Sequence, residues 1–194
     1  MKELIEFMLD SLTSFRFRAI LMNVRPTEVS TLAQQLHGAT PQLSIQNCFA
    51  FVQQQITFQP EVNGSDDWQS PSQTIQRKAG DCEDKTALLM SLLSNYNIPT
   101  WLLVIHNIHW LEYHAVVLVK VPFQPVMLLD TTLAHPFNEY PPYIHDANTK
   151  VVGIYGTNLL NNLFIPFGVP LAYVIDTLSF LPLPSDFLGN IIIK

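Results

Sequence analysis

The chain has 194 residues, of which 48% are hydrophobic and 13% are charged, and its formal net charge is −6. This composition excludes a disordered chain and suffices for one domain with a sizeable core. The negative charge and the lack of a basic run argue against a nucleic-acid partner. Only two cysteines are present, Cys48 and Cys82, which excludes a disulfide framework and a multi-cysteine zinc site.

No segment has the pattern of a signal peptide or of a membrane span. Residues 1–6 carry acidic side chains where a signal peptide has basic ones. The most apolar stretch, residues 159–183, is interrupted by Asn161, Pro166 and Asp176, so no membrane span is predicted. We therefore expect a cytoplasmic protein.

The first half of the chain predicts helices. Residues 4–22 are apolar at mixed spacing and predict one or two short helices, and a second helical segment begins at Pro26 and ends near Gly38. Residues 41–56 predict a third helix with apolar side chains at helical spacing. The side chains expected to face the core are Leu43, Ile45, Phe49, Val52 and Ile56.

Residues 58–72 are rich in proline, glycine and aspartate, and we interpret them as a loop that leads toward Cys82. After Pro99 the pattern changes to β-branched and aromatic residues, which predict strands. Residues 122–125 supply a turn that joins the last two of the three main strands in an antiparallel hairpin. Helices followed by an antiparallel sheet indicate the α+β class. The main strands are predicted at 101–105, 113–121 and 126–130, with further candidates at 151–155 and 191–193.

Cys82 lies at the start of a helix, within the sequence Gly-Asp-Cys-Glu-Asp at residues 80–84. Asp81 is a good N-cap residue, and the apolar pattern that follows predicts a helix that ends before Pro99. The helix dipole lowers the pKa of a thiol at this position, and unpaired backbone N–H groups can stabilise an oxyanion. The alternative is that Cys82 is only a small residue in a well-capped turn.

His114 and Asp130 are the residues that could activate such a thiol. His114 begins the strand at 113–121 and Asp130 ends the strand at 126–130, and each lies eight residues from Pro122. A hairpin that turns at Pro122 would place them opposite each other, with Cβ atoms about 4.5–5.5 Å apart. The alternatives are a satisfied core histidine and an aspartate that begins a turn.

The other chemically active side chains favour simpler interpretations. His106 and His109 fall in a polar loop, where they would be solvated or face a substrate, and they make a poor zinc site without a third ligand. Cys48 lies within an amphipathic helix and is interpreted as a buried structural thiol.

Three motifs in this order resemble the transglutaminase-like superfamily: Gly-Asp-Cys-Glu-Asp at 80–84, Tyr-His-Ala-Val-Val at 113–117 and Leu-Leu-Asp-Thr-Thr at 128–132. The segment at 67–75 is similar to the one that precedes the cysteine in bacterial transglutaminase-like cysteine proteinases. The resemblance covers about residues 41–135. It implies a papain-like catalytic core at 41–135, which follows a helical segment at 1–40 and precedes an apolar extension at 136–194 that packs on the core.

The resemblance implies that Cys82 is the nucleophile, His114 the general base and acid, and Asp130 the group that orients His114. The expected activity is hydrolysis of an amide bond in a protein or peptide substrate through a thioester acyl-enzyme. One alternative is an acyl-transferase that passes the acyl group of a protein glutamine to an amine. Another is a non-catalytic interaction domain with the same fold.

The backbone N–H of Cys82 is the natural first donor to the oxyanion. A side chain is expected to supply the second, and the candidates are Gln76, Gln69 and Trp68.

The acidic residues beside Cys82 present a conflict, because their charge should raise the pKa of the thiol. The carboxylates could bond to backbone donors, a Cys–His ion pair could outweigh them, or a cation could neutralise them. In some proteinases of the resembled group, acidic residues beside the cysteine bind calcium, so Asp81 and Glu83 are candidate calcium ligands. No other cofactor is expected.

Residues 151–194 are apolar. They are expected either to pack on the sheet or to offer an exposed surface to a protein partner.

Overall fold

The structure is a computed structural model that describes residues 19–60, 68–107, 109, 113–137, 139–156 and 168–180. Of the segment at 4–22 that was predicted to be helical, residues 19–22 are described and are helical. Residues 4–18 and the strand predicted at 191–193 lie outside the described residues.

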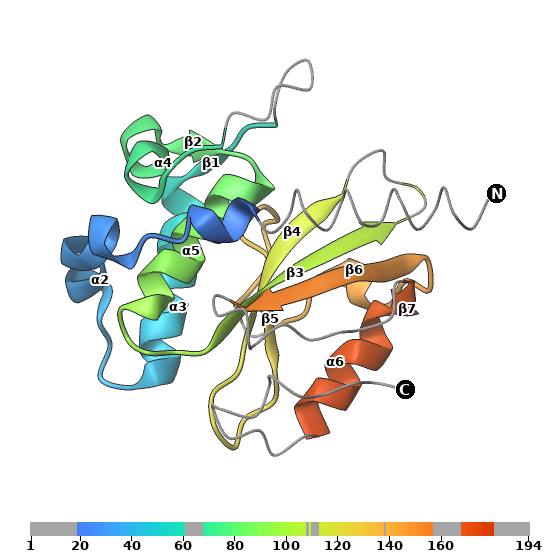
Figure 1. Ribbon diagram of the computed structural model, residues 1–194. Coiled ribbons are helices and arrows are strands. Elements are labelled where there is room, and N and C mark those ends of the chain that lie inside the picture. The colour runs from blue at the N-terminus through green and yellow to red at the C-terminus, as the bar shows by residue number, and fades with distance from the viewer. Residues whose placement is uncertain are drawn as a thin grey trace.

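The helices of the first half of the chain form a layer on one side of the molecule (Figure 1). The segment predicted to be helical from Pro26 is a 3-10 turn, η1 (Pro26–Val29), continued by α2 (Ser30–Leu36). Helix α3 (Pro41–Gln55) begins at Thr40, whose side chain accepts a hydrogen bond from the backbone N–H of Leu43. The prediction that Leu43 faces the core is wrong. Its position in the exposed first turn leaves the side chain 41% exposed.

A short helix, α4 (Pro71–Arg77), precedes Cys82. Its first two residues belong to the segment that was predicted to be a loop. It is held at its start by a capping box, in which Ser70 accepts from the N–H of Gln73 and Gln73 accepts from the N–H of Ser70. On either side of it, β1 (Thr57–Phe58) pairs in parallel with β2 (Ala79–Gly80). Helix α5 (Cys82–Ser94) follows directly.

The expected α+β class is confirmed. The main sheet is antiparallel, in the order β5-β4-β3-β6-β7. Its strands are β3 (Thr100–Asn107), β4 (His114–Val119), β5 (Met127–Leu129), β6 (Thr149–Gly156) and β7 (Val169–Pro170).

The predicted register between His114 and Asp130 is wrong by two residues. Strand β4 pairs with β5 through Val117 and Leu129, which places Asp130 opposite Val116 when the register is continued. The hairpin is therefore centred on Phe123, one residue later in the chain than predicted. Because side chains alternate faces with a period of two, a shift of two residues keeps His114 and Asp130 on the same face of the sheet.

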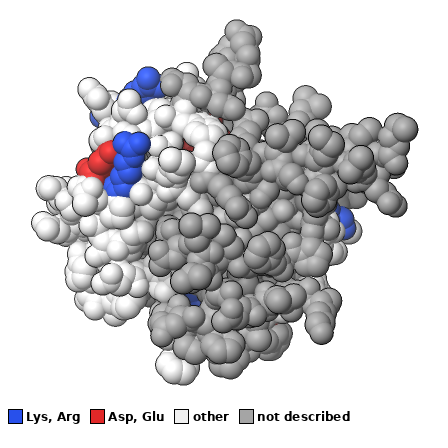
Figure 2. Space-filling view, in the orientation of Figure 1, with Lys and Arg blue, Asp and Glu red and all other residues white. Residues whose placement is uncertain are grey.

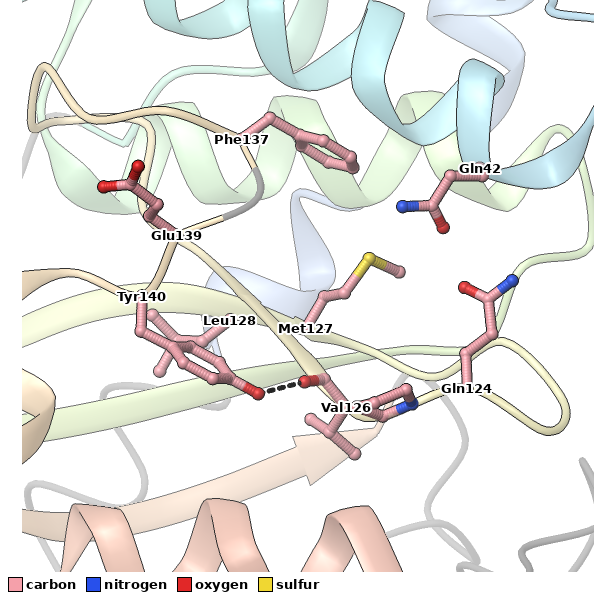
Figure 3. Close-up of a pocket in the computed structure, with 9 residues that line it drawn as sticks. Gln42, Gln124, Val126, Met127, Leu128, Phe137, Glu139 and Tyr140 are labelled. Atoms are coloured by element: carbon pink, nitrogen blue, oxygen red, sulfur yellow. Dashed lines mark hydrogen bonds between the residues drawn. The ribbon is translucent and has the colours of Figure 1, made fainter.

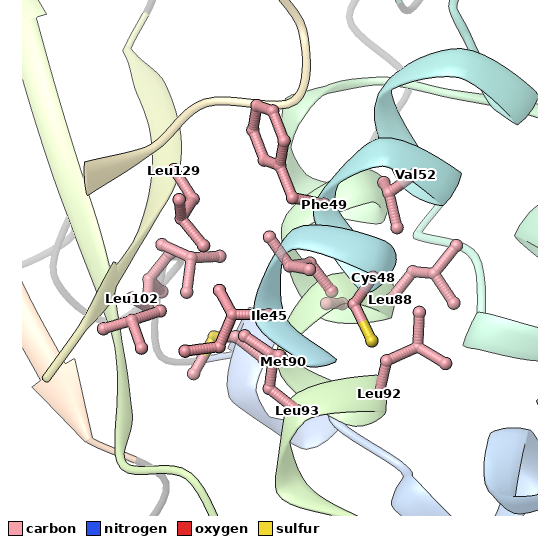
Figure 4. Close-up of a cluster of buried hydrophobic side chains, with 14 of the residues drawn as sticks. Ile45, Cys48, Phe49, Val52, Leu88, Met90, Leu92, Leu93, Leu102 and Leu129 are labelled. Atoms are coloured by element: carbon pink, nitrogen blue, oxygen red, sulfur yellow. The ribbon is translucent and has the colours of Figure 1, made fainter. Parts of the chain in front are cut away.

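Two apolar clusters hold the sheet between layers of helix. Helices α3 and α5 cover one face (Figure 4), and α6 (Leu171–Phe180) covers the other. Each fully buried Leu, Ile or Phe contributes about 1.5–3 kcal/mol, so α5 is fixed firmly on the sheet. Buried side chains at the interface of α3 and α5 with the sheet include Ile45, Phe49, Leu88, Leu92, Leu102 and Leu129.

Within the described part of the chain, no helix is long and apolar enough to cross a bilayer. The described part of the face in Figure 2 carries few charged side chains, which agrees with the low charged fraction of the sequence.

Candidate active site

Cys82 is the first residue of α5, and Asp81 caps the helix as the sequence predicts. The Oδ1 atom of Asp81 accepts hydrogen bonds from the backbone N–H groups of Glu83 at 2.9 Å and of Asp84 at 3.0 Å. One of the carboxylates beside the thiol thus bonds to backbone donors, which is one of the three expected ways to accommodate the acidic residues.

The backbone N–H and C=O groups of Ala115, the residue after His114, both form hydrogen bonds with side chains of α5. Its N–H makes a hydrogen bond with the Cys82 thiol, and its carbonyl accepts one from Thr86 Oγ1 at 3.0 Å. Cys82 and Thr86 are four residues apart and therefore share one face of the helix. This contact places the thiol against the peptide that follows His114.

The imidazole of His114 is bonded through Nε2 to Asp130 Oδ2 at 2.8 Å. The carboxylate of Asp130 is fully buried, and its other oxygen accepts from the backbone N–H of Thr132 at 2.9 Å and from its hydroxyl at 2.6 Å. Burial alone would raise the pKa of Asp130, but the hydrogen bonds from His114 and Thr132 outweigh it and lower the pKa to about 2. Asp130 is therefore an ionised acceptor at neutral pH.

Tyr143 is a member of this cluster that the sequence did not reveal. It lies in η2 (Pro142–His145), and its hydroxyl donates to Asp130 Oδ2 at 2.8 Å. Its ring stands edge-on to the His114 imidazole, with centroids 6.2 Å apart and an interplanar angle of 88°. The only signal in the sequence is the Pro141-Pro142 pair before it, which predicts a turn but gives no direction for the side chain.

The thiol of Cys82 is held in its neutral form. Burial raises its pKa above the usual range, and the charges of Asp81, Glu83 and Asp130 add to the effect. The hydrogen bond with the Ala115 N–H acts in the opposite direction. A nucleophile in this state needs a base that removes the proton as it attacks.

Asp84 fixes the segment before α4 to the first turn of α5. Its carboxylate accepts from the backbone N–H of Gln69 at 2.8 Å and from the Gln69 side-chain amide at 2.5 Å. Burial raises the pKa of Asp84 to about 6, because these bonds only partly offset the loss of water. A Cβ atom at Gly80 would lie 2.7 Å from Asp84 Cβ, so the glycine of the motif makes room for this contact.

The three candidates for the second oxyanion donor have different surroundings. The amide N–H of Gln69 is bonded to Asp84, and Gln76 is exposed on α4. The indole Nε1 of Trp68 is buried and has no hydrogen-bond partner among the described residues, although a buried donor normally has one. Since Trp68 adjoins Gln69, its backbone lies beside the first turn of α5.

Lys85 is a buried cation at the site that the sequence did not reveal. Its side chain is 1% exposed, and its Nζ atom donates to the carbonyl of Ile56 at 2.5 Å. Burial lowers its pKa to about 8, and the charge of Asp130 acts against that change.

The other residues singled out in the sequence make contacts outside this cluster. The backbone N–H of His109 bonds to Asn107, His106 packs against Tyr113, and Cys48 is buried. A cavity lined by β5 and by Phe137, Glu139 and Tyr140 is not lined by Cys82 or His114 (Figure 3).

A calcium ion at this site would have to be held by the acidic residues beside the cysteine. In the described ranges, no group of three or more His, Cys, Asp or Glu side chains could hold a metal. Asp81 and Glu83 alone supply fewer oxygens than the six to eight that calcium takes. The described residues by themselves therefore do not fit calcium.

The model of the family described as "Transglutaminase-like domain" matches residues 27–153. The chain belongs to this transglutaminase-like family. The match begins before and ends after residues 41–135, over which the sequence motifs indicate resemblance.

Solved structures support the transglutaminase-like fold. Legionella pneumophila LapG has a TM-score of 0.52 at 17% identity, over 64% of this chain and 70% of LapG. Calcium-bound LapG has a TM-score of 0.50 at 18% identity, over 84% of this chain and 95% of LapG. A candidate protease from Parabacteroides distasonis has a TM-score of 0.54 at 14% identity, over 73% of this chain and 28% of that one.

A curated relative is the UPF0252 protein MJ1282 of Methanocaldococcus jannaschii. It is 27% identical over 140 residues, which are 66% of this chain and 40% of the relative. The chain thus matches about two fifths of the length of that protein.

Proposed function

We propose that this transglutaminase-like protein is a cysteine-dependent amide-bond hydrolase that acts on a protein or peptide through a thioester acyl-enzyme. The observation that carries the proposal is the Asp130–His114 hydrogen bond, in which a fully buried, ionised carboxylate orients an imidazole. The residue after that histidine is bonded to the Cys82 thiol. A nucleophile, a base and an orienting group thus occur in one short region.

In the proposed reaction, His114 removes the thiol proton as Cys82 Sγ attacks the substrate carbonyl carbon. The backbone N–H of Cys82 and the indole N–H of Trp68 would bind the oxyanion, and the unpartnered state of the indole supports that role. His114 then gives the proton to the leaving amine as the C–N bond breaks, which leaves a thioester. Water, deprotonated by His114, attacks the thioester and releases the acid and the thiol. Calcium has no part in these steps.

The proposal is tested with p-nitrophenyl acetate, whose acyl transfer to a thiol releases p-nitrophenolate. We expect one acetyl group per chain on Cys82, found by mass spectrometry of the protein. Cys82→Ala should abolish this acylation, and His114→Ala should slow it about 10²–10⁴-fold because the general base is lost. Cys48→Ala removes the other cysteine, which is buried and lies away from the cluster, and is the matched control.

Equal acylation rates in wild type and His114→Ala would refute the proposal. A library of peptides then tests amide hydrolysis. Addition of a primary amine separates hydrolysis from acyl transfer, because a transferase would release the amine-coupled product in place of the acid.

A further inference from the structure

Tyr143 and His114 donate to the same oxygen of the buried Asp130 carboxylate. Both distances to Oδ2 are 2.8 Å, while Oδ1 is occupied by the two donors of Thr132. Four donors therefore surround a carboxylate that has no contact with water. Because the Tyr143 hydroxyl shares Oδ2 with His114, it reduces the strength of the hydrogen bond and charge interaction between Asp130 and the imidazole.

The hydroxyl of Tyr143 is a fixed donor. Burial raises the pKa of Tyr143 well above its usual range, and the charge of Asp130 and the hydrogen bond to it add to this effect. The hydroxyl therefore keeps its proton and cannot act as a base for the thiol.

The segment that carries Tyr143 is anchored by the residues that follow it. Ile144 is buried in the cluster beneath α6, and Asp146 accepts from the side chain of Asn107 at 2.7 Å. The same Asn107 amide also donates to Thr149 at 2.9 Å. Since Asn107 ends β3, the position of the Tyr143 ring is fixed to the sheet that carries His114.

We propose that Tyr143 is a positioning residue that fixes the Asp130 carboxylate and the plane of the His114 ring, and that moderates how strongly the carboxylate stabilises the imidazolium. This inference rests on the proposed function. Removal of the hydroxyl leaves His114 facing a carboxylate with one donor fewer, so the imidazolium gains a stronger partner. The titratable groups that face the pair are Cys82 and Lys85 on α5, Tyr143 on η2 and His135 in the loop after Asp130.

The test compares Tyr143→Phe with Tyr140→Phe. Tyr140 belongs to the neighbouring loop and donates its hydroxyl to the carbonyl of Val126 at 2.7 Å (Figure 3), so its variant also loses hydroxyl hydrogen bonding but leaves Asp130 untouched. The titration of His114 is followed by NMR in Cys82→Ala protein, which removes the coupled thiol. Acylation by p-nitrophenyl acetate is measured in protein that retains Cys82.

We expect Tyr143→Phe to move the His114 titration midpoint upward by about 0.5 pH unit and to slow acylation about 5- to 10-fold. Tyr140→Phe should change neither. A midpoint equal to that of Tyr140→Phe would overturn the inference, whether or not acylation slows, because slower acylation alone would follow from a general loss of structure. Failure of the wild type to acylate at Cys82 would refute the proposed function, and the NMR titration would still decide the role of Tyr143.

Discussion

Substitution of Thr86 by valine tests whether α5 holds the thiol against β4. Thr86 is 3% exposed, and its hydroxyl donates to the Ala115 carbonyl at 3.0 Å. Valine keeps the branched shape of threonine and a similar helix propensity, so the substitution removes little besides this hydrogen bond.

The expected magnitude follows from the burial of both groups. A net hydrogen bond contributes about 0.5–1.5 kcal/mol, and a buried carbonyl left without a partner costs about 1–3 kcal/mol. Ala115 is 2% exposed, so water cannot replace the lost donor without a local opening of the structure. We expect the free energy of unfolding to fall by about 1.5–2.5 kcal/mol. Acylation of Cys82 should slow about tenfold, because the thiol is less well placed.

Urea unfolding followed by circular dichroism gives the stability change, and p-nitrophenyl acetate gives the acylation rate. Ser94→Ala is the matched control, because Ser94 lies on the same helix and donates to the carbonyl of Met90 at 2.8 Å, within the helix. It should cost less than about 0.5 kcal/mol and leave acylation unchanged. A Thr86→Val protein as stable and as reactive as Ser94→Ala would show that this contact does not position the thiol.

Two further predictions concern charge. Because the pKa of Lys85 is lowered to about 8 from 10.5, folded protein loses this proton before unfolded protein does, so the Lys85 contribution to stability rises between these pH values. The free energy of unfolding of the wild type, measured in urea, should therefore rise relative to that of Lys85→Met between pH 8 and pH 9.5. A difference that stays constant over this range would contradict the lowered pKa of Lys85. Because the described residues do not by themselves form a calcium site, the melting temperature of the wild type should be the same in calcium chloride and in EGTA. A higher melting temperature in calcium chloride that is lost in Glu83→Gln would contradict this expectation, because only a calcium ion held by the acidic residues beside Cys82 would produce it.

The part of the site that the sequence predicts depends on periodicity. The hairpin prediction brought His114 and Asp130 together although its register was wrong by two residues, because an even shift keeps both side chains on one face. A shift of one residue would have separated them. The helix start at Cys82 was predictable for a similar reason, since caps depend on residues close in sequence.

The rest depends on contacts between segments distant in sequence. Tyr143, Lys85 and the bond between Asp84 and Gln69 have no local pattern, because each is defined by a partner 13 to 29 residues away. Helix α4 is different. Its capping box at Ser70 and Gln73 is visible in the sequence, but the prolines and acidic residues before it favoured the loop interpretation.

The contact of α5 with Ala115 also occupies backbone hydrogen-bonding groups at an edge of the sheet. Strand β5 ends at Leu129, opposite Val117, so β4 extends beyond its neighbour toward His114. The N–H and C=O groups of one residue in a strand point to the same side, and at Ala115 both are bonded by the helix. Cys82 and Thr86 thus occupy hydrogen-bonding groups that an unpaired strand edge would offer to another polypeptide. The proposed nucleophile therefore also protects β4 from edge-to-edge association.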